Sequence, residues 1–251
     1  MKEVMIHQLI PIHLQINMKR FSRLLPLIGE DNLVKLSNSK VIVFGIGGVG
    51  GFAVETLARS GLGSFILVDS DTVEETNINR QLVASYETIG QSKVEVMAKH
   101  ILSINPEAKV ETIKKFYLPE NELEFDFTQY DYVIDCVDTV SAKISIICKA
   151  KELGVPVISA MGAGNKLNPS KLKVADIYKT DTDPLAKVIR RELRKRNIKS
   201  LDVVYSTEEP IVNALEVDNK KPTPASAMAV PSVMGIMIGQ FVINELIKKS
   251  A

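Results

Sequence analysis

The sequence predicts an α/β fold built on a doubly wound, mostly parallel sheet, with a C-terminal antiparallel extension and a terminal helix. Three observations predict it. Residues 40–69 read as strand, glycine turn, helix and strand. Apolar strands and helices then keep alternating as far as residue 160. The alternation stops at 161–164, after which two strands are separated by a helix instead of joined by a further parallel crossover.

The elements follow from short apolar runs for strands and from helical spacing of apolar residues. Residues 21–36 have helical spacing, and Gly29 is predicted to separate two short helices. The first strand is 41–44, its helix ends near Arg59, and the second strand is 64–69. The remaining predictions are a helix at about 91–105, strands at 109–114 and 131–138, a helix at about 141–153, strands at 155–160, 172–178 and 201–206, a helix beginning at 183–184, and a terminal helix at 231–248.

The glycine turn is the strongest functional signal. Gly45, Gly47 and Gly50 fill a G-x-G-x-x-G pattern, which presents backbone N–H groups to phosphate at a helix N-terminus. Asp69 ends the next strand, 24 positions after Gly45, where an acid that binds ribose hydroxyls is expected. Since strand, helix, strand and acid flank the glycines, the segment favours nucleotide binding over a turn that only packs a helix.

Polar and charged residues follow the predicted strand ends, where open α/β sheets bind ligands. The segment 70–81 carries Arg80, and Lys93 begins a later helix; two cations suit a triphosphate. Asp138 ends the strand 131–138, a position for a magnesium ligand or a catalytic acid. Asp135 lies inside the apolar run and could instead cap a buried amide.

Composition bounds the class of protein. The chain has 251 residues, 45% of them hydrophobic and 24% charged, with a formal net charge of +1, which fits a soluble globular domain with at most an appended subdomain. Cys136 and Cys148 are the only cysteines, so a disulfide framework and a four-cysteine zinc site are excluded and a reducing cytosol is indicated. Polar residues interrupt the apolar stretch 225–247, which favours a buried core helix over a membrane span.

The chain divides into an extension and one domain. Residues 1–17 have no signal-type cleavage site and precede Met18, which reads as a second start, so we expect an extension that is disordered or reflects the choice of start codon. Residues 18–251 form the domain, with a nucleotide-binding half at about 40–160 and a substrate-facing part at about 161–251. The residues 211–229 read as a mobile loop.

The helix that begins at 183–184 becomes strongly basic. Between 187 and 199 only Glu192 opposes seven cations, which favours a surface for an RNA or DNA backbone over an ordinary solvated face. These cations are Lys187, Arg190, Arg191, Arg194, Lys195, Arg196 and Lys199.

Five sequence blocks together resemble the adenylating domain of E1-like enzymes, the superfamily of ubiquitin-activating enzymes and bacterial activators of sulfur-carrier proteins. The blocks are 45–50, 69–71, 76–81, 90–93 and 135–138. Within it, residues 162–164, 179–186 and 204–208 are similar to a subgroup that acts on N6-threonylcarbamoyladenosine at position 37 of tRNA. The resemblance implies ATP-dependent activation of the threonyl carboxylate as an acyl-adenylate, then ring closure with loss of AMP and, overall, of water.

The resemblance also implies residue roles. Arg80 and Lys93 would neutralise phosphate charge, and Asp138 would hold magnesium or orient the α-phosphate. Arg23 matches an arginine that reaches the partner subunit's ATP in a homodimer, and a sulfur-relay partner is left open. The ATP site as a whole would comprise Gly45, Gly47, Gly48, Gly50, Asp69, Asp71, Asn77, Asn79, Arg80, Gln81, Lys93 and Asp138, and the tRNA surface Lys187, Arg190, Arg191, Arg194, Lys195 and Arg196.

Three alternatives remain open. An activator of a small ubiquitin-like sulfur carrier shares the adenylation chemistry, although the chain lacks both paired zinc cysteines and a thioester cysteine in 211–229. A nicotinamide-dependent oxidoreductase would use the glycine pattern and Asp69 equally well but would leave Arg80 and Lys93 without a purpose. A non-catalytic nucleotide-binding scaffold would not need the phosphate-handling residues.

Overall fold

The computed structural model describes residues 18–211 and 224–248. The predicted extension 1–17 lies outside the described residues, as do residues 212–223 of the predicted loop and 249–251.

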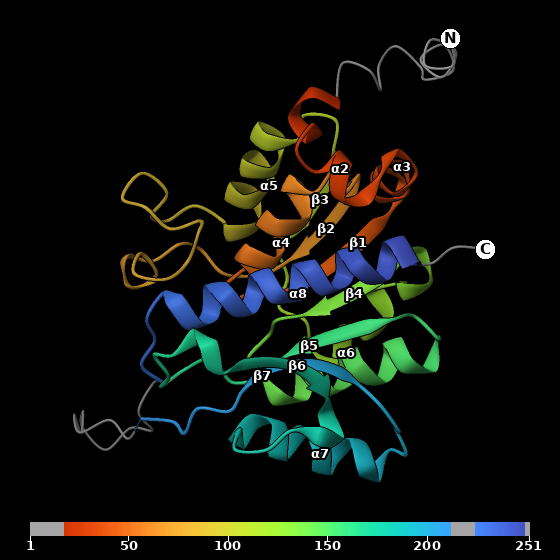
Figure 1. The fold of residues 1–251 in the computed structure, drawn as a ribbon. Coiled ribbons are helices and arrows are strands. Elements are labelled where there is room, and N and C mark those ends of the chain that lie inside the picture. The colour runs from red at the N-terminus through yellow and green to blue at the C-terminus, as the bar shows by residue number, and fades with distance from the viewer. Residues whose placement is uncertain (1–17, 212–223, 249–251) are drawn as a thin grey trace.

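A seven-stranded sheet organises the described part of the chain, in the order β3-β2-β1-β4-β5-β7-β6 (Figure 1). Neighbouring strands in this order are parallel, except for the last pair, β7 and β6, which is antiparallel. The predicted mostly parallel sheet with an antiparallel C-terminal extension is therefore confirmed. The strands are β1 Lys40–Phe44, β2 Ser64–Val68, β3 Lys109–Ile113, β4 Tyr132–Asp135, β5 Val157–Ala160, β6 Leu172–Asp176 and β7 Asp202–Ser206.

Helices cover both faces of this sheet (Figure 1). The predicted α-helices are present, most with ends shifted by one or two residues. They are α2 Leu25–Ile28, α3 Glu30–Asn38, α4 Gly50–Arg59, α5 Lys93–Ile104, α6 Val140–Glu152, α7 Pro184–Lys195 and α8 Ala229–Lys248. Short 3-10 helices are η1 Met18–Phe21, η2 Glu75–Asn77, η3 Pro119–Glu124, η4 Phe127–Gln129, η5 Pro169–Lys171 and η6 Ile177–Lys179.

Three strand boundaries differ from the prediction by two or three residues, for local reasons. β6 ends at Asp176 and not at 178, because the Asp176 side chain accepts a hydrogen bond from the Tyr178 N–H at 2.8 Å and caps the 3-10 helix η6. β4 ends at Asp135, whose side chain accepts a hydrogen bond from the Val137 N–H at 3.2 Å, so the chain turns there. Asp138 therefore lies in the loop before α6 and not on the strand. β5 begins at Val157 and not at 155, because Pro156 has no N–H to donate to a ladder.

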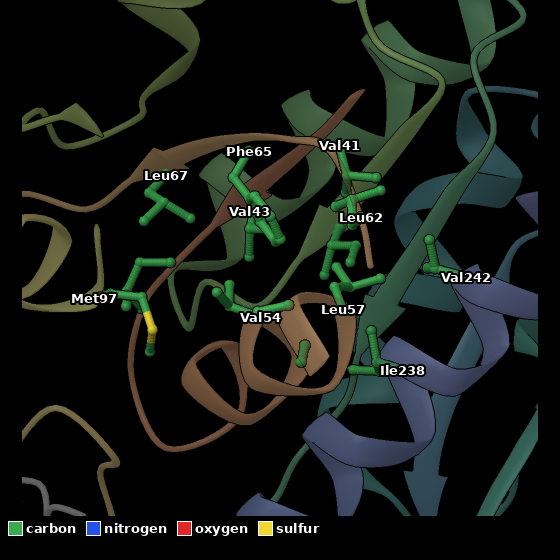
Figure 2. Packing of buried hydrophobic residues seen from close by; sticks show 14 of the residues in the cluster. Val41, Val43, Val54, Leu57, Leu62, Phe65, Leu67, Met97, Ile238 and Val242 are labelled. Carbon is green, nitrogen blue, oxygen red and sulfur yellow. The ribbon is translucent and has the colours of Figure 1, made fainter. Parts of the chain in front are cut away.

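The larger core lies between the sheet and the helices α4, α5 and α8. Val54 and Leu57 of α4 pack under β1 and β2, while Ile238 and Val242 of α8 lie beside them (Figure 2). Gly235 permits this contact, since a Cβ there would lie 2.1 Å from the Val49 carbonyl oxygen.

Helix α8 is long and apolar enough to cross a membrane, but 56% of its most apolar window is buried inside the protein. The predicted buried core helix is confirmed.

Helix α7 runs against the direction of the parallel strands. Its start, Asp183, contacts Gly162, just beyond the carboxyl end of β5. Its end leads through 196–201 to the first residue of β7, at the amino ends of the parallel strands. The basic C-terminal half of α7 therefore lies at the edge opposite the carboxyl ends of β1, β2 and β4.

Candidate functional site

A cavity of about 600 Å³ opens at the carboxyl ends of β1, β2 and β4. This is the edge at which open α/β sheets bind their ligands. It brings together most of the predicted site, namely Gly45, Gly47, Gly48, Asp69, Asp71, Asn77, Arg80, Gln81, Lys93 and Asp138.

The glycine turn forms one wall because side chains would not fit. Gly45 has φ +86°, and a Cβ there would lie 2.7 Å from the Cys136 carbonyl oxygen. At Gly48 a Cβ would come within 3.3 Å of Pro231 and 3.4 Å of the Arg80 carbonyl oxygen. The backbone therefore forms the cavity surface, as a phosphate-binding turn requires.

Asp69 stands fixed beside this turn. Its two carboxylate oxygens accept hydrogen bonds from the backbone N–H groups of Ile46 at 2.6 Å and Asp71 at 2.8 Å. Burial raises the pKa of Asp69, an effect opposed by these two bonds and by the nearby Lys93. Each carboxylate oxygen has more than one lone pair, so Asp69 can still accept from a ribose hydroxyl.

Two cations also line the cavity. The Lys93 ammonium is buried and pairs with Asp71 Oδ2 at 2.8 Å. Arg80 donates from Nη1 to the Thr76 carbonyl oxygen at 2.8 Å and to Asn79 Oδ1 at 3.0 Å. Both cations are thus held in place before any ligand arrives, which suits an anionic ligand whose charge must be neutralised.

Gln81 carries an unsatisfied acceptor at the same site. Its side chain is buried and lines the cavity, yet Oε1 has no hydrogen-bond partner among the residues that the structure describes. A buried polar atom without a partner is costly unless a ligand or water completes it. The cavity is therefore suited to a polar ligand.

Three predicted site residues do not line the cavity. Gly50 packs against the turn, where a Cβ would lie 1.8 Å from the Gly45 carbonyl oxygen. Asn79 donates from Nδ2 to the Ser226 carbonyl oxygen at 2.8 Å. Arg23 is exposed and outside the cavity, while its neighbour Arg20 is bound to Glu107 and Asn105.

Asp138 is an exposed residue of the cavity wall. Among the described residues, no cluster of three or more histidine, cysteine or acidic side chains could hold a metal ion by itself. A single carboxylate still fits magnesium, because this ion is commonly held by one or two carboxylates together with the phosphates of its ligand.

Sequence reasoning missed the wall that follows β3, which Lys115, Phe116 and Tyr117 supply. Tyr117 packs edge-on against Phe44, with ring centroids 4.9 Å apart, and burial raises its pKa to about 12. These residues directly follow β3, a parallel strand next to β2, and that position could have predicted them as part of the cavity wall.

The two cysteines differ in setting. Cys136 packs on the larger core and also lines the cavity. Burial raises the pKa of its thiol to about 12. Cys148 packs on the smaller core with a partly exposed side chain, and burial raises its pKa too. Thiols with raised pKa values are poor nucleophiles.

A buried ion pair supports the loop that carries Asp138. The Lys143 ammonium donates to Asp135 Oδ2 at 2.8 Å, to Ser159 Oγ at 3.1 Å and to the Ala160 carbonyl oxygen at 2.9 Å. Lys143 and Asp135 are both fully buried. Asp135 caps an amide as predicted, at Val137, although that N–H is only partly buried; Lys143 was not predicted.

The cations of α7 have unequal settings. Arg191, Lys195 and Arg196 all pair with Glu192. Arg190 points back to the Thr180 carbonyl oxygen at 2.6 Å, and Arg194 lies over the Tyr178 ring. Lys187 is exposed. The count of seven cations against one acid therefore overstates the charge that is available to a ligand.

Comparison with known proteins is consistent with this site. Residues 21–249 match the ThiF family. The tRNA threonylcarbamoyladenosine dehydratase of Bacillus subtilis is 44% identical over 241 residues, which is 91% of this chain and 95% of that protein. Crystal structures of the E. coli tRNA N6-threonylcarbamoyladenosine dehydratase in complex with ATP and with AMP superpose with a TM-score of 0.85 at 33% identity, covering 92% of this chain and 95% of those chains.

Proposed function

The chain belongs to the ThiF family, and on that basis we propose that it is an ATP-dependent enzyme that dehydrates N6-threonylcarbamoyladenosine at position 37 of tRNA. The observation that carries the proposal is the 44% identity to a tRNA threonylcarbamoyladenosine dehydratase over 95% of that protein's length. The cavity adds chemical support, because a glycine turn, a fixed carboxylate and two preplaced cations suit ATP.

The reaction proceeds in two steps. A threonyl carboxylate oxygen attacks the α-phosphorus of ATP, pyrophosphate leaves and an acyl-adenylate forms. A nitrogen or oxygen of the same modification then attacks the acyl carbon and AMP leaves, so the ring closes with net loss of water. No enzyme thiol is needed, which agrees with the raised pKa values of Cys136 and Cys148.

The residues of the cavity divide this work. The backbone at Gly45, Gly47 and Gly48 holds the phosphates, and Asp69 holds the ribose. Arg80 and Lys93 stabilise the negative charge that builds up at the α-phosphate and on the departing pyrophosphate. Asp138, with the phosphates, would hold magnesium, which supplies further neutralisation when bound.

The tRNA contacts α7 through Lys187, Arg191, Arg194, Lys195 and Arg196, while Arg190 acts mainly within the protein. Arg23 lies outside its own cavity, which agrees with a homodimer in which it reaches the partner's ATP. We also propose that the protein works in the cytoplasm, and a sulfur-relay protein is compatible with the proposal as a further partner.

Mass spectrometry of tRNA nucleosides tests the proposal after incubation of modified tRNA with ATP, magnesium and purified protein. We expect loss of 18 Da, the mass of one water, from N6-threonylcarbamoyladenosine, with AMP released in equal amount. Arg80→Ala and Asp138→Ala should abolish AMP formation while the fold stays intact. Arg59→Ala, which removes an exposed arginine of α4, is the matched control and should keep full turnover. Full turnover in either site variant would show that the assigned site is wrong.

A further inference from the structure

Two asparagines connect the phosphate-binding cavity to the chain that leads into α8. Asn165 lies in the turn after β5, and Asn79 lies next to Arg80. Both bind residues 225–226 through their side-chain amides. Neither is part of the cavity wall.

Asn165 holds its segment by paired hydrogen bonds. Its N–H donates to the Ala225 carbonyl oxygen at 2.7 Å, and its Oδ1 accepts from the Ala225 N–H at 2.7 Å. It has φ +58°, a left-handed conformation that asparagine tolerates better than most residues. This turn therefore fixes the position of residue 225 relative to the end of β5.

The turn itself is firmly anchored. The buried Lys166 ammonium donates to the Gly162 carbonyl oxygen at 2.6 Å and to Asp183 Oδ2 at 2.9 Å. Asp183 also accepts from the Gly162 N–H at 3.1 Å and, through Oδ1, from the Ala186 N–H at 2.9 Å at the start of α7. The turn is thus tied to the rigid sheet and to α7.

Asn79 completes the connection with a single amide group. Its Nδ2 donates to the Ser226 carbonyl oxygen at 2.8 Å, while its Oδ1 accepts from Arg80 Nη1 at 3.0 Å. Both hydrogen bonds that the Arg80 side chain makes within the described part of the chain use Nη1, so the edge of the guanidinium formed by Nε and Nη2 is left for an oxyanion. Asn79 thereby sets the orientation of the edge that faces a ligand.

From this arrangement we propose that Asn79 is a positioning residue: it orients Arg80 for the phosphates of ATP by tying the guanidinium to Ser226, and Asn165 supports it by holding Ala225. The inference rests on the proposed function, since it assigns Arg80 to ATP. Preorganising a flexible arginine removes part of the entropy cost of binding, so the loss of Asn79 weakens ATP binding without a change in the fold.

Calorimetric titration of the full chain with a non-hydrolysable ATP analogue and magnesium tests the proposal. Asn79→Ala should weaken binding about three- to tenfold, the range expected for the net loss of one typical hydrogen bond. Asn165→Gly, which keeps the left-handed backbone but removes Oδ1, should weaken it less. Asn244→Ala, which removes an exposed amide near the far end of α8, is the matched control and should bind as wild type does.

A double-mutant cycle separates positioning from a direct or merely structural role. If Asn79 acts through Arg80, then Asn79→Ala should have no further effect on affinity in an Arg80→Ala background. Equal losses in both backgrounds, or unchanged affinity in Asn79→Ala alone, would overturn the inference while leaving the proposed function in place. Failure of the wild-type protein to bind the analogue would overturn both.

Discussion

Replacing Lys143 by methionine should destabilise the protein strongly, because the substitution leaves Asp135 buried without its cation. Within the described part of the chain, the carboxylate would keep only the Ser159 hydroxyl at 2.6 Å and the Val137 N–H at 3.2 Å as donors. Breaking a buried ion pair from one side costs about 3–5 kcal/mol. Since a domain is stable by about 5–15 kcal/mol in total, Lys143→Met should lose a large share of its free energy of unfolding.

Urea denaturation followed by circular dichroism measures the change. Burial already raises the pKa of Asp135, and removal of Lys143 would raise it further. The unpaired carboxylate destabilises the variant fully at a pH above that raised pKa, and protonation relieves the loss as the pH falls through it. The difference in unfolding free energy between wild type and variant should therefore narrow in acid.

Two further variants make the test specific to the ion pair. Lys151→Met removes another lysine of α6, whose side chain makes no hydrogen bond or ion pair within the described residues, and should change stability by less than about 1 kcal/mol. The substitution Asp135→Asn, added to Lys143→Met, removes the unpaired buried charge and should restore part of the lost free energy of unfolding. If Lys143→Met cost no more than Lys151→Met, the reasoning about the pair would be refuted.

Three other outcomes are expected. Gly50→Ala should prevent soluble folding, because its Cβ would lie 1.8 Å from the Gly45 carbonyl oxygen; a normal yield of folded protein in a soluble-expression assay would contradict this. Asp183→Ala should lower the free energy of unfolding by about 3 kcal/mol or more, since it removes the cap of α7 and strands the buried Lys166; thermal denaturation measures it. Glu192→Gln should tighten tRNA binding about threefold and steepen its salt dependence, because it frees three paired cations; filter binding across salt concentrations that shows no change would remove α7 from the RNA surface.

The parts of the site that sequence predicted well are those determined by neighbours along the chain. Gly45, Gly47 and Asp69 belong to one strand–turn–helix–strand unit, whose spacing fixes where they meet. Asp138 was placed correctly at the cavity although the end of its strand was not, since the loop still leaves β4 at the same edge.

Other features depend on contacts that spacing does not reveal. Lys143 reads as one more lysine of an amphipathic helix until the ends of β4 and β5 bring Asp135 and Ser159 together beneath it. Asn79 reads as part of the nucleotide motif, yet its amide binds Ser226, 147 positions away. Lys143 lies eight positions from Asp135, and only the packing of α6 on the strand ends revealed its role, whereas separation along the chain hid the role of Asn79.

The direction of α7 has a consequence for which molecules the protein can accept. Its 12 residues, at about 1.5 Å each, extend about 18 Å from the ligand edge of the sheet towards the opposite edge. A free modified nucleoside is too short to fill the cavity and also touch the basic end of this helix. If α7 contacts tRNA as proposed, a folded RNA would do both, and we expect substrate length to be a basis for selection before any chemistry begins.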